Sequence, residues 1–340
     1  MIKKETILNI RNVYTAAAFQ VDGTTYVAAG SETEPEVYLC QLDRRKVERL
    51  PDCPGGMMSF LPVPGHPDQF ISIMGLFPPF IGEEAGLFLH QREAGGWNTV
   101  RAMDLPFAHR CEIIRNGGEN FLLAASVSIH KENPSDWSRP GELHLISLDR
   151  QSTIPWSSEV LDMSIVRNHG MTRARIGGNE AVCISGAEGI FYLERDSGGR
   201  WKFRPVFDRE VSEMSFADLD GDGQDELVTI EPFHGETLSI YKRTGKHWMT
   251  QFTAPLSFGH GLSAGRFNGM PVVIVGNRSG SRNLEMFTIG DIKQGSVKKS
   301  IVEPEAGPTQ TQVFRMDGRD YILSANQRKD EVALYREEAD

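Results

Sequence analysis

The sequence predicts an all-β fold, a seven-bladed β-propeller closed by its amino-terminal strand. A short run of alternating apolar residues recurs seven times along the 340 residues. A tryptophan follows four of these runs, and a loop of alternating carboxylates lies between two strand-like flanks. Alternation with a period of two is typical of strands, and a repeat of roughly 40–50 residues is typical of propeller blades.

The repeated runs begin at intervals of 46 to 56 residues. Their first apolar residues are Val37, Leu87, Leu143, Ile190, Leu238, Leu284 and Val332. Four short strands fit into each interval, so we expect a single domain over residues 1–340. The expected blades span approximately 12–53, 54–107, 108–166, 167–210, 211–256, 257–305, and 306–340 together with 1–11.

The outer strands and the closure of the ring follow from two further features. The tryptophans that we expect to open outer strands, where they pack between blades, are Trp97, Trp156, Trp201 and Trp248. The last repeat ends at Tyr335, after its third strand, and Glu5–Ile10 can supply the fourth. Pairing the first strand with the last blade removes the exposed sheet edges.

The fifth repeat contains an acidic loop that predicts a cation site. Gly223 stands at the sixth position, where the backbone must turn sharply. Alternating carboxylates around such a turn supply the oxygen ligands that Ca²⁺ or Mg²⁺ prefers. The expected ligands are Asp218, Asp220, Asp222, the backbone carbonyl of Gln224, and Glu226. The loop joins the first two strands of its blade, which predicts a structural role.

Alignment of the inner strands brings three histidines to one height. Several turns end in a glycine before an apolar strand, and the residue nine positions earlier is aligned between blades. The aligned residues are Tyr14, His109, His169, His260 and Thr309, with Ser212 in the fifth blade. Any one histidine could simply bind water in the channel. Together, His109, His169 and His260 suit Zn²⁺ or another divalent transition metal with an open coordination position.

The loops between second and third strands share a face with these histidines, because the inner strands begin there. The candidate acids or bases are His130, Lys131 and His234. The candidate substrate-binding residues are Arg110, Asn277, Arg278, Asn326 and Arg328. An apolar wall from Phe77, Phe80 and Trp137 is a further expectation.

The acidic loop resembles the calcium loop of FG-GAP (VCBS) repeats, and the chain as a whole resembles the propeller of the aldos-2-ulose dehydratases. The segments Asn168–Met171, Gly186–Gly189 and Ala325–Gln327 are similar to this group as well. The resemblance implies a divalent ion in the acidic loop, a metal at the channel histidines, and elimination of water from a keto-sugar. Those dehydratases carry further domains that have no counterpart here.

The predicted function is therefore a metal-dependent lyase, of the sugar-dehydratase type, or an isomerase. It would act on a small keto-sugar or sugar derivative at the histidine centre. Two alternatives stay open. One is another carbohydrate-cleaving propeller enzyme, a lyase or a glycosidase, although a glycosidase needs paired carboxylates. The other is a calcium-stabilised propeller that binds a partner without catalysis.

Charge and hydropathy exclude other classes of partner. The net charge of −10 argues against nucleic acid, because there is no basic run to replace its counterions. No apolar stretch is long enough to predict a membrane span, and we expect no signal peptide. Cys40, Cys53, Cys111 and Cys183 lack metal-ligand spacing and are expected to be reduced. These features predict a cytoplasmic protein.

Overall fold

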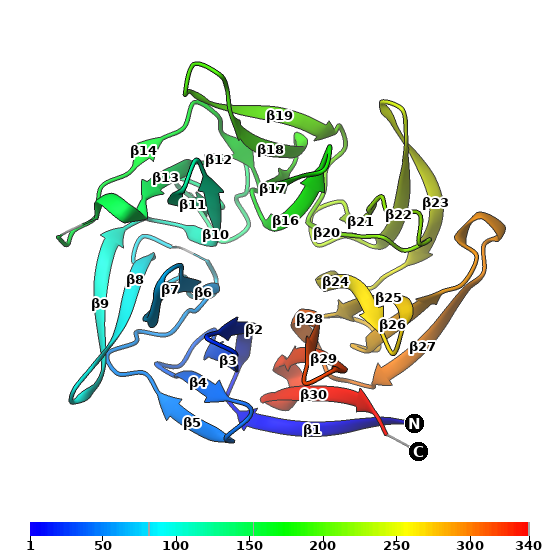
Figure 1. The fold of residues 1–340 in the computed structure, drawn as a ribbon, viewed down its shortest axis with the longest axis horizontal. Helices are drawn as coiled ribbons and strands as arrows, with labels where there is room; N and C mark the ends of the chain where they lie inside the picture. Colours follow the sequence, from blue (N-terminus) through cyan, green and yellow to red (C-terminus); the bar gives the residue numbers. More distant parts are fainter. Residues whose placement is uncertain (81, 152, 339–340) are drawn as a thin grey trace.

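Strands with alternating burial form a ring of seven blades around a central channel, which confirms the predicted fold class (Figure 1). The computed structural model describes residues 1–80, 82–151 and 153–338. Within these residues, seven four-stranded antiparallel sheets are present, and a two-stranded sheet accompanies the third blade. In each of the first six blades the chain runs from the inner strand outward, so the first strand lines the channel.

The strands of the first three blades have the following bounds. Blade one contains β2 (Val13–Val21), β3 (Thr24–Ser31), β4 (Val37–Gln41) and β5 (Lys46–Arg49). Blade two contains β6 (Ser59–Val63), β7 (His66–Met74), β8 (Gly86–Glu93) and β9 (Gly96–Asp104). Blade three contains β10 (Ala108–Asn116), β11 (Glu119–Ser126), β13 (Leu143–Ser147) and β14 (Glu159–Val160), and β12 (Pro140–Gly141) pairs with β15 (Ile165–Val166).

The remaining blades continue the ring. Blade four contains β16 (Gly170–Ile176), β17 (Asn179–Gly186), β18 (Gly189–Arg195) and β19 (Trp201–Phe207). Blade five contains β20 (Glu213–Ala217), β21 (Glu226–Glu231), β22 (Thr237–Thr244) and β23 (His247–Pro255). Blade six contains β24 (Gly259–Phe267), β25 (Met270–Asn277), β26 (Leu284–Ile289) and β27 (Val297–Glu303). Blade seven contains β28 (Pro308–Met316), β29 (Arg319–Asn326), β30 (Glu331–Glu337) and β1 (Ile2–Asn9).

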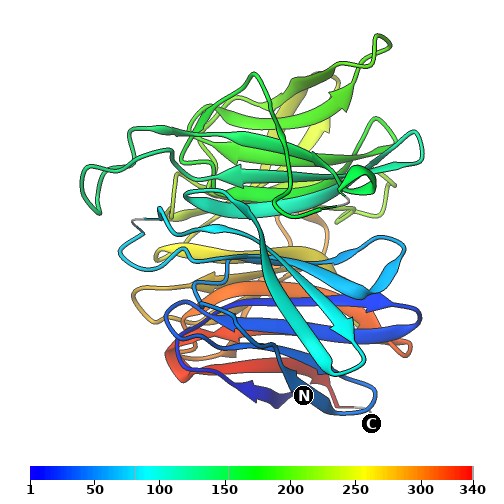
Figure 2. The same cartoon turned by 90° about the vertical axis from the view of Figure 1, so that its left-hand side faces the viewer.

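The amino-terminal strand closes the ring, as the sequence predicted. β1 pairs antiparallel with β30, from Ile2 opposite Glu337 to Asn9 opposite Glu331. The first strand, β1, and the last, β30, therefore lie side by side at the edge of one blade (Figures 1 and 2). Nζ of Lys4, on β1, forms ion pairs with Glu331 on the paired strand and, at 3.3 Å, with Glu303 at the end of β27 in the sixth blade. Both backbone pairing and charge hold the closure in place.

Apolar side chains on the sheet faces form the core between neighbouring blades. In one such cluster Ile71, Ile73 and Leu87 of the second blade pack with Leu122 and Ile146 of the third. All five are fully buried, and burying an aliphatic side chain of this size contributes about 1.5–3 kcal/mol. The alternating apolar residues that predicted the strands are therefore the residues whose packing stabilises the contact between blades.

The predicted tryptophan positions hold in three blades. Trp97, Trp201 and Trp248 lie on outer strands, whereas Trp156 lies before β14. In that third blade the outer strand is only two residues long, and Pro155, which has no N–H to donate to a ladder, precedes it. Among the described residues, no helix has the length and apolarity needed to cross a membrane.

β-Bulges at the entrances of the inner strands matter most for the site. The pairing of inner and second strands shifts register at the first positions of β2, β10, β24 and β28. The residues in these shifts include Tyr14, His109, His260 and Thr309, the positions that sequence alignment had brought together. A bulge re-aims a side chain relative to the regular pleat. The same irregularity therefore recurs around the channel mouth.

Candidate metal centre

Three histidines from three blades bring ring nitrogens within 4.8 Å of one another: His169, His234 and His260. His169 directly precedes β16, and His260 is the second residue of β24. His234 lies in the loop between β21 and β22, with a left-handed backbone (φ 48°) that non-glycine residues seldom adopt. The cluster is buried, with only His234 partly exposed. It has the residue types and the convergence of a metal centre.

The distance between two of these rings fits a tetrahedral ion. The Nε2 atoms of His169 and His234 are 3.3 Å apart. Zinc–imidazole bonds of about 2.0–2.1 Å at the tetrahedral angle separate two ligand nitrogens by about 3.3 Å. The His260 ring is perpendicular to that of His169, with centroids 5.2 Å apart. The three side chains can therefore share one divalent ion.

His109 lies beside this group without belonging to it. Its ring centroid is 4.4 Å from that of His169, and the side chain is 3% exposed. Its Nδ1 is buried and has no hydrogen-bond partner among the described residues. The sequence had placed His109 with His169 and His260 as ligands and His234 as a candidate base. In the structure the β21–β22 loop carries His234 into the cluster, while the His109 ring lies against His169.

A buried carboxylate holds His169. Oε1 of Glu213, in β20, is 2.8 Å from Nδ1 of His169 and 2.9 Å from Nη2 of Arg110. Arg110 also donates to the carbonyl of Met58 at 3.0 Å. Burial alone would raise the pKa of Glu213, but Arg110 and His169 outweigh it and hold the pKa below its usual range. A charged Glu213 favours the proton on Nδ1 of His169, which leaves Nε2 free to bind a metal.

A backbone carbonyl orients His260 in the same way. Nδ1 of His260 donates to the carbonyl oxygen of Thr309 at 2.6 Å, since a carbonyl can only accept. Nε2 therefore carries a lone pair, and the hydroxyl of Tyr14 lies 3.0 Å from it. Burial lowers the pKa of His260, of His234 and of His109. These imidazoles are therefore neutral at neutral pH, the form in which a histidine binds a metal.

Aromatic side chains enclose the cluster on the loop side. The His234 ring is stacked against Phe233 and against Phe258, at centroid distances of 4.0 and 4.6 Å. Trp137 lies 5.3 Å from Phe233, and the Nζ of Lys131 is 3.5 Å from the Trp137 ring centroid. Aromatic residues from the third, fifth and sixth blades thus line the surroundings of the histidines.

The predicted bases differ in their surroundings. Lys131 is buried and donates to the carbonyl of Pro134 at 2.6 Å, and burial lowers the pKa of its ammonium. His130 is exposed. The apolar wall expected from Phe77, Phe80 and Trp137 is present in part, because Phe80 lies 6.5 Å from Trp137. Lys131 is thus the buried base candidate outside the histidine cluster.

The predicted substrate-binding residues separate into two groups. Arg110 lies beside Glu213, and the Arg278 guanidinium is 5.8 Å from the ring of Tyr14 and bonded to Gln327. These two arginines belong to the surroundings of the histidines. In contrast, the Asn277 side chain is hydrogen-bonded to the backbone of Ser257 and Asn283. The Asn326 side chain is hydrogen-bonded to Ser324, Glu331 and Tyr335, and Arg328 is exposed.

The central channel provides space next to the cluster. A cavity of about 400 Å³ follows the inner strands and reaches Arg110, Glu213 and His260 at one end. This volume lies within the range of about 300–1,000 Å³ that is typical of small-molecule pockets. The cavity connects the histidine centre with the channel rather than with the aromatic side of the loops.

The acidic loop lies at the other end of its blade. It connects the end of β20 to the start of β21, whereas the histidines stand where inner strands begin. Carboxylate oxygens of Asp218, Asp220 and Asp222 come within 4.8 Å of one another. Gly223, with φ 84°, makes the turn that the sequence predicted, and its N–H donates to Asp218 at 3.0 Å.

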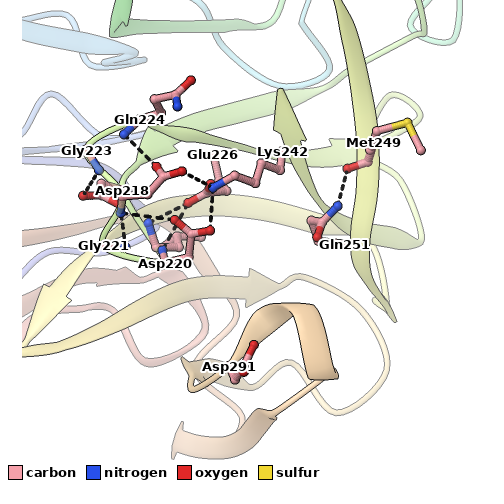
Figure 3. A network of polar contacts seen from close by, with 12 residues as sticks. Asp218, Asp220, Gly221, Gly223, Gln224, Glu226, Lys242, Met249, Gln251 and Asp291 are labelled. Atoms are coloured by element: carbon pink, nitrogen blue, oxygen red, sulfur yellow. Dashed lines mark hydrogen bonds and ion pairs between the residues drawn. The ribbon is translucent and has the colours of Figure 1, made fainter. Parts of the chain in front are cut away.

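A lysine already supplies positive charge to this loop (Figure 3). Nζ of Lys242, on β22, donates to Asp220, to Asp222 at 2.7 Å and to Glu226 at 3.1 Å. Burial disfavours the charged ammonium, but these hydrogen bonds outweigh it and raise the pKa of Lys242. The N–H of Gln224 donates to Asp222 at 3.0 Å. A divalent ion would compete with Lys242 for three carboxylates.

The fold and the two clusters define the chain as a seven-bladed β-propeller with a possible three-histidine site and a possible acidic cation site. No protein-family model matches the sequence, and a search of curated proteins finds no match. The propeller that the resemblance implied is present. The more specific resemblance to FG-GAP repeats and to aldos-2-ulose dehydratases stays a prediction.

Sequence reasoning did not assign roles to Glu213 and Tyr14. Tyr14 occupied an aligned position, and Glu213 adjoined another, so the alignment contained a signal for both. A tyrosine or a glutamate on a strand indicates no functional role by its residue type alone, because the role depends on what the side chain contacts. The contacts to His260 and His169 appear only when the blades close into a ring.

Proposed function

We propose that the protein is a metal-dependent lyase of the dehydratase type, or an isomerase, that acts on a small keto-sugar or sugar derivative. Zinc or another divalent transition metal would be held by His169, His234 and His260. The observation that carries the proposal is the convergence of three buried ring nitrogens within 4.8 Å. The surroundings of the two Nδ1 atoms support it, because that of His169 lies 2.8 Å from Glu213 and that of His260 donates to the Thr309 carbonyl, which leaves Nε2 of each ring for a metal.

The donor set fits such an ion. Three neutral imidazoles suit zinc, and such sites commonly keep one position for water or substrate. When bound, the ion would supply Lewis acidity toward a carbonyl oxygen. Glu213 orients His169 through its Nδ1, and Arg110 compensates the charge of Glu213. Thr309 orients His260 through its carbonyl oxygen.

The base in this proposal is Lys131. Elimination requires a group that removes a proton from the carbon next to the carbonyl, and His234 is unavailable if it binds the metal. Burial lowers the pKa of Lys131, which favours the neutral amine that the role needs. Lys131 lies on the aromatic side of the cluster, where Trp137 and Phe233 stand between it and His234, so a substrate at the centre would have to extend from the channel toward these loops to meet it.

The acidic loop in this proposal binds Ca²⁺ or Mg²⁺ and stabilises the turn between β20 and β21. Its carboxylates and glycine turn match the ligands of a hard cation. The role is structural, since the loop lies at the end of the inner strand opposite the histidines. Lys242 would have to give up its contacts when the ion binds.

The proposal is tested in two steps. Purified protein is analysed for metals, and the metal-loaded protein is then screened against keto-sugars for loss of water or isomerisation. We expect His169→Ala to lose both the transition metal and the activity, while His247→Ala, at an exposed histidine of β23, keeps both. Full activity of His169→Ala on an identified substrate would refute the metal centre.

The alternatives are separated by the same experiment. A protein that binds a hard cation only and converts no sugar would be a binding propeller. Sugar hydrolysis would point to a glycosidase, but this needs two free carboxylates. Glu213, the carboxylate that contacts the cluster, is already paired with Arg110. The surroundings of the histidines therefore favour elimination over hydrolysis.

A further inference from the structure

Tyr14 places a phenol next to Nε2 of His260, the ring nitrogen that does not donate to Thr309. Its hydroxyl is 3.0 Å from Nε2 of His260, and the two rings meet edge to face with centroids 5.4 Å apart. Tyr14 is 3% exposed and lies in the β-bulge that opens β2. Its backbone carbonyl accepts a hydrogen bond from the Thr309 hydroxyl at 2.7 Å. The phenol is therefore fixed at the channel mouth.

The direction of this hydrogen bond follows from its neighbours. Because Nδ1 of His260 donates to the Thr309 carbonyl, Nε2 of His260 can only accept. The Tyr14 hydroxyl must then be the donor. The lone pair that it occupies is the one that a metal would take, so the hydroxyl and a metal compete for it.

Metal binding leaves the Tyr14 hydroxyl without its acceptor in a buried site. A buried donor without a partner is costly, so the hydroxyl has to find another acceptor nearby. Two nearby acceptors already have partners: Glu213 is paired with Arg110, and the Thr309 carbonyl accepts from His260. The oxygen that completes the metal shell is the acceptor that metal binding itself introduces.

We propose that Tyr14 caps Nε2 of His260 in the metal-free protein and, once the metal is bound, donates its hydrogen bond to the oxygen ligand at the open coordination position. This inference rests on the proposed metal centre. The oxygen would belong to water or to the carbonyl of the substrate. A neutral phenol donor there would stabilise negative charge on that oxygen.

Two binding measurements on Tyr14→Phe test this role without relying on turnover. The first is Zn²⁺ affinity, from competition with a chromophoric chelator. Removing the competing hydrogen bond should tighten Zn²⁺ binding by roughly three- to tenfold at unchanged stoichiometry. The second is the affinity of the Co²⁺-loaded protein for acetohydroxamate, read from the cobalt absorption bands. It should weaken by about tenfold, because the oxygen ligand loses its donor.

Tyr26→Phe is the control, since Tyr26 packs against Phe19 and Phe70 away from the histidines. It should leave both affinities unchanged. Weaker Zn²⁺ binding by Tyr14→Phe would make Tyr14 a metal ligand and overturn the inference. Unchanged Zn²⁺ and acetohydroxamate affinities would overturn it as well, and would leave the metal centre standing. If the wild-type protein bound neither Zn²⁺ nor Co²⁺, the proposed function would fail together with the inference.

Discussion

Replacing Lys242 by methionine should turn the acidic loop from a lysine-neutralised turn into one that depends on calcium. The Lys242 side chain is 16% exposed and contacts Asp220, Asp222 and the fully buried Glu226 (Figure 3). Methionine preserves the length and the apolar stem of the side chain. The change therefore removes the positive charge with little loss of packing.

The expected cost follows from these contacts. A hydrogen bond between charged groups contributes about 1.5–3 kcal/mol when shielded, and an exposed ion pair contributes less than about 1 kcal/mol. The contact with buried Glu226 belongs to the first kind, and the one with Asp222, which is 37% exposed, belongs to the second. Without Ca²⁺, Lys242→Met should lower the free energy of unfolding by about 2–3 kcal/mol.

Calcium should reverse this loss. A ligand at a hundred times its dissociation constant stabilises the folded state by about 2.7 kcal/mol. In the wild-type protein Ca²⁺ must first displace the Lys242 ammonium, so the same Ca²⁺ concentration should stabilise it less. Urea unfolding with EDTA and with millimolar Ca²⁺ measures both effects. Lys246→Met, an exposed change on the same hairpin, is the matched control.

Equal stability of Lys242→Met and the wild type in EDTA would refute the role of Lys242 as the internal counter-ion. A Lys242→Met protein that is destabilised in EDTA but does not respond to Ca²⁺ or Mg²⁺ would refute the cation site. The two parts of the reasoning can therefore fail separately.

Three further predictions concern the metal shell and the closure of the ring. Glu213→Gln should weaken Zn²⁺ binding by about 10–100-fold in chelator competition, because His169 loses its charged partner, while Glu112→Gln in the same channel should not. Lys4→Met should lower the free energy of unfolding by about 1 kcal/mol at pH 7. Burial alone would raise the pKa of Glu331, but hydrogen bonds from Lys4 and Asn326 outweigh it and lower the pKa. The ion pair therefore stabilises the folded protein at pH values above the pKa of Glu331 in the unfolded chain. This stabilisation is lost as the pH falls through the pKa of Glu331 in the folded protein. Urea unfolding should therefore show the Lys4→Met difference shrinking below about pH 4, and a difference that grows there would contradict this assignment. Asn326→Ala should cost about 2–3 kcal/mol in urea unfolding, since its amide donates to both Glu331 and Tyr335, and a cost below about 0.5 kcal/mol would contradict a structural role for this amide.

Much of the fold could be predicted because each blade repeats one local pattern. Alternating apolar runs such as Glu36–Leu42 and Glu331–Tyr335 report strand burial directly, and their spacing reports the blade. The closing strand was predictable from the unfinished last repeat. The short outer strand after Trp156, only Glu159–Val160, was not, because the spacing of the apolar runs does not report strand length.

The sequence could predict at which end of the channel the candidate site lies, but not which side chains contact one another there. Alignment of the blades brought His169 and His260 to one height, and the shared face placed His234 near them. The position of His234 beside His169 and His260 depends on the path of the β21–β22 loop, where His234 has a left-handed backbone. Lys242 was also hidden, since it reaches the acidic loop from the third strand of the blade. Such contacts between segments leave no pattern in the sequence.

Metal content of the histidine variants tests the central claim most directly. The wild-type protein, freed of metal and then loaded with Zn²⁺ in the presence of excess Ca²⁺, should retain about one Zn²⁺ per chain after desalting. His234→Ala should lose this zinc, whereas His109→Ala should retain it, because only His234 shares the 4.8 Å cluster with His169 and His260. Full zinc retention by His234→Ala, or a wild-type protein without zinc, would contradict the three-histidine centre.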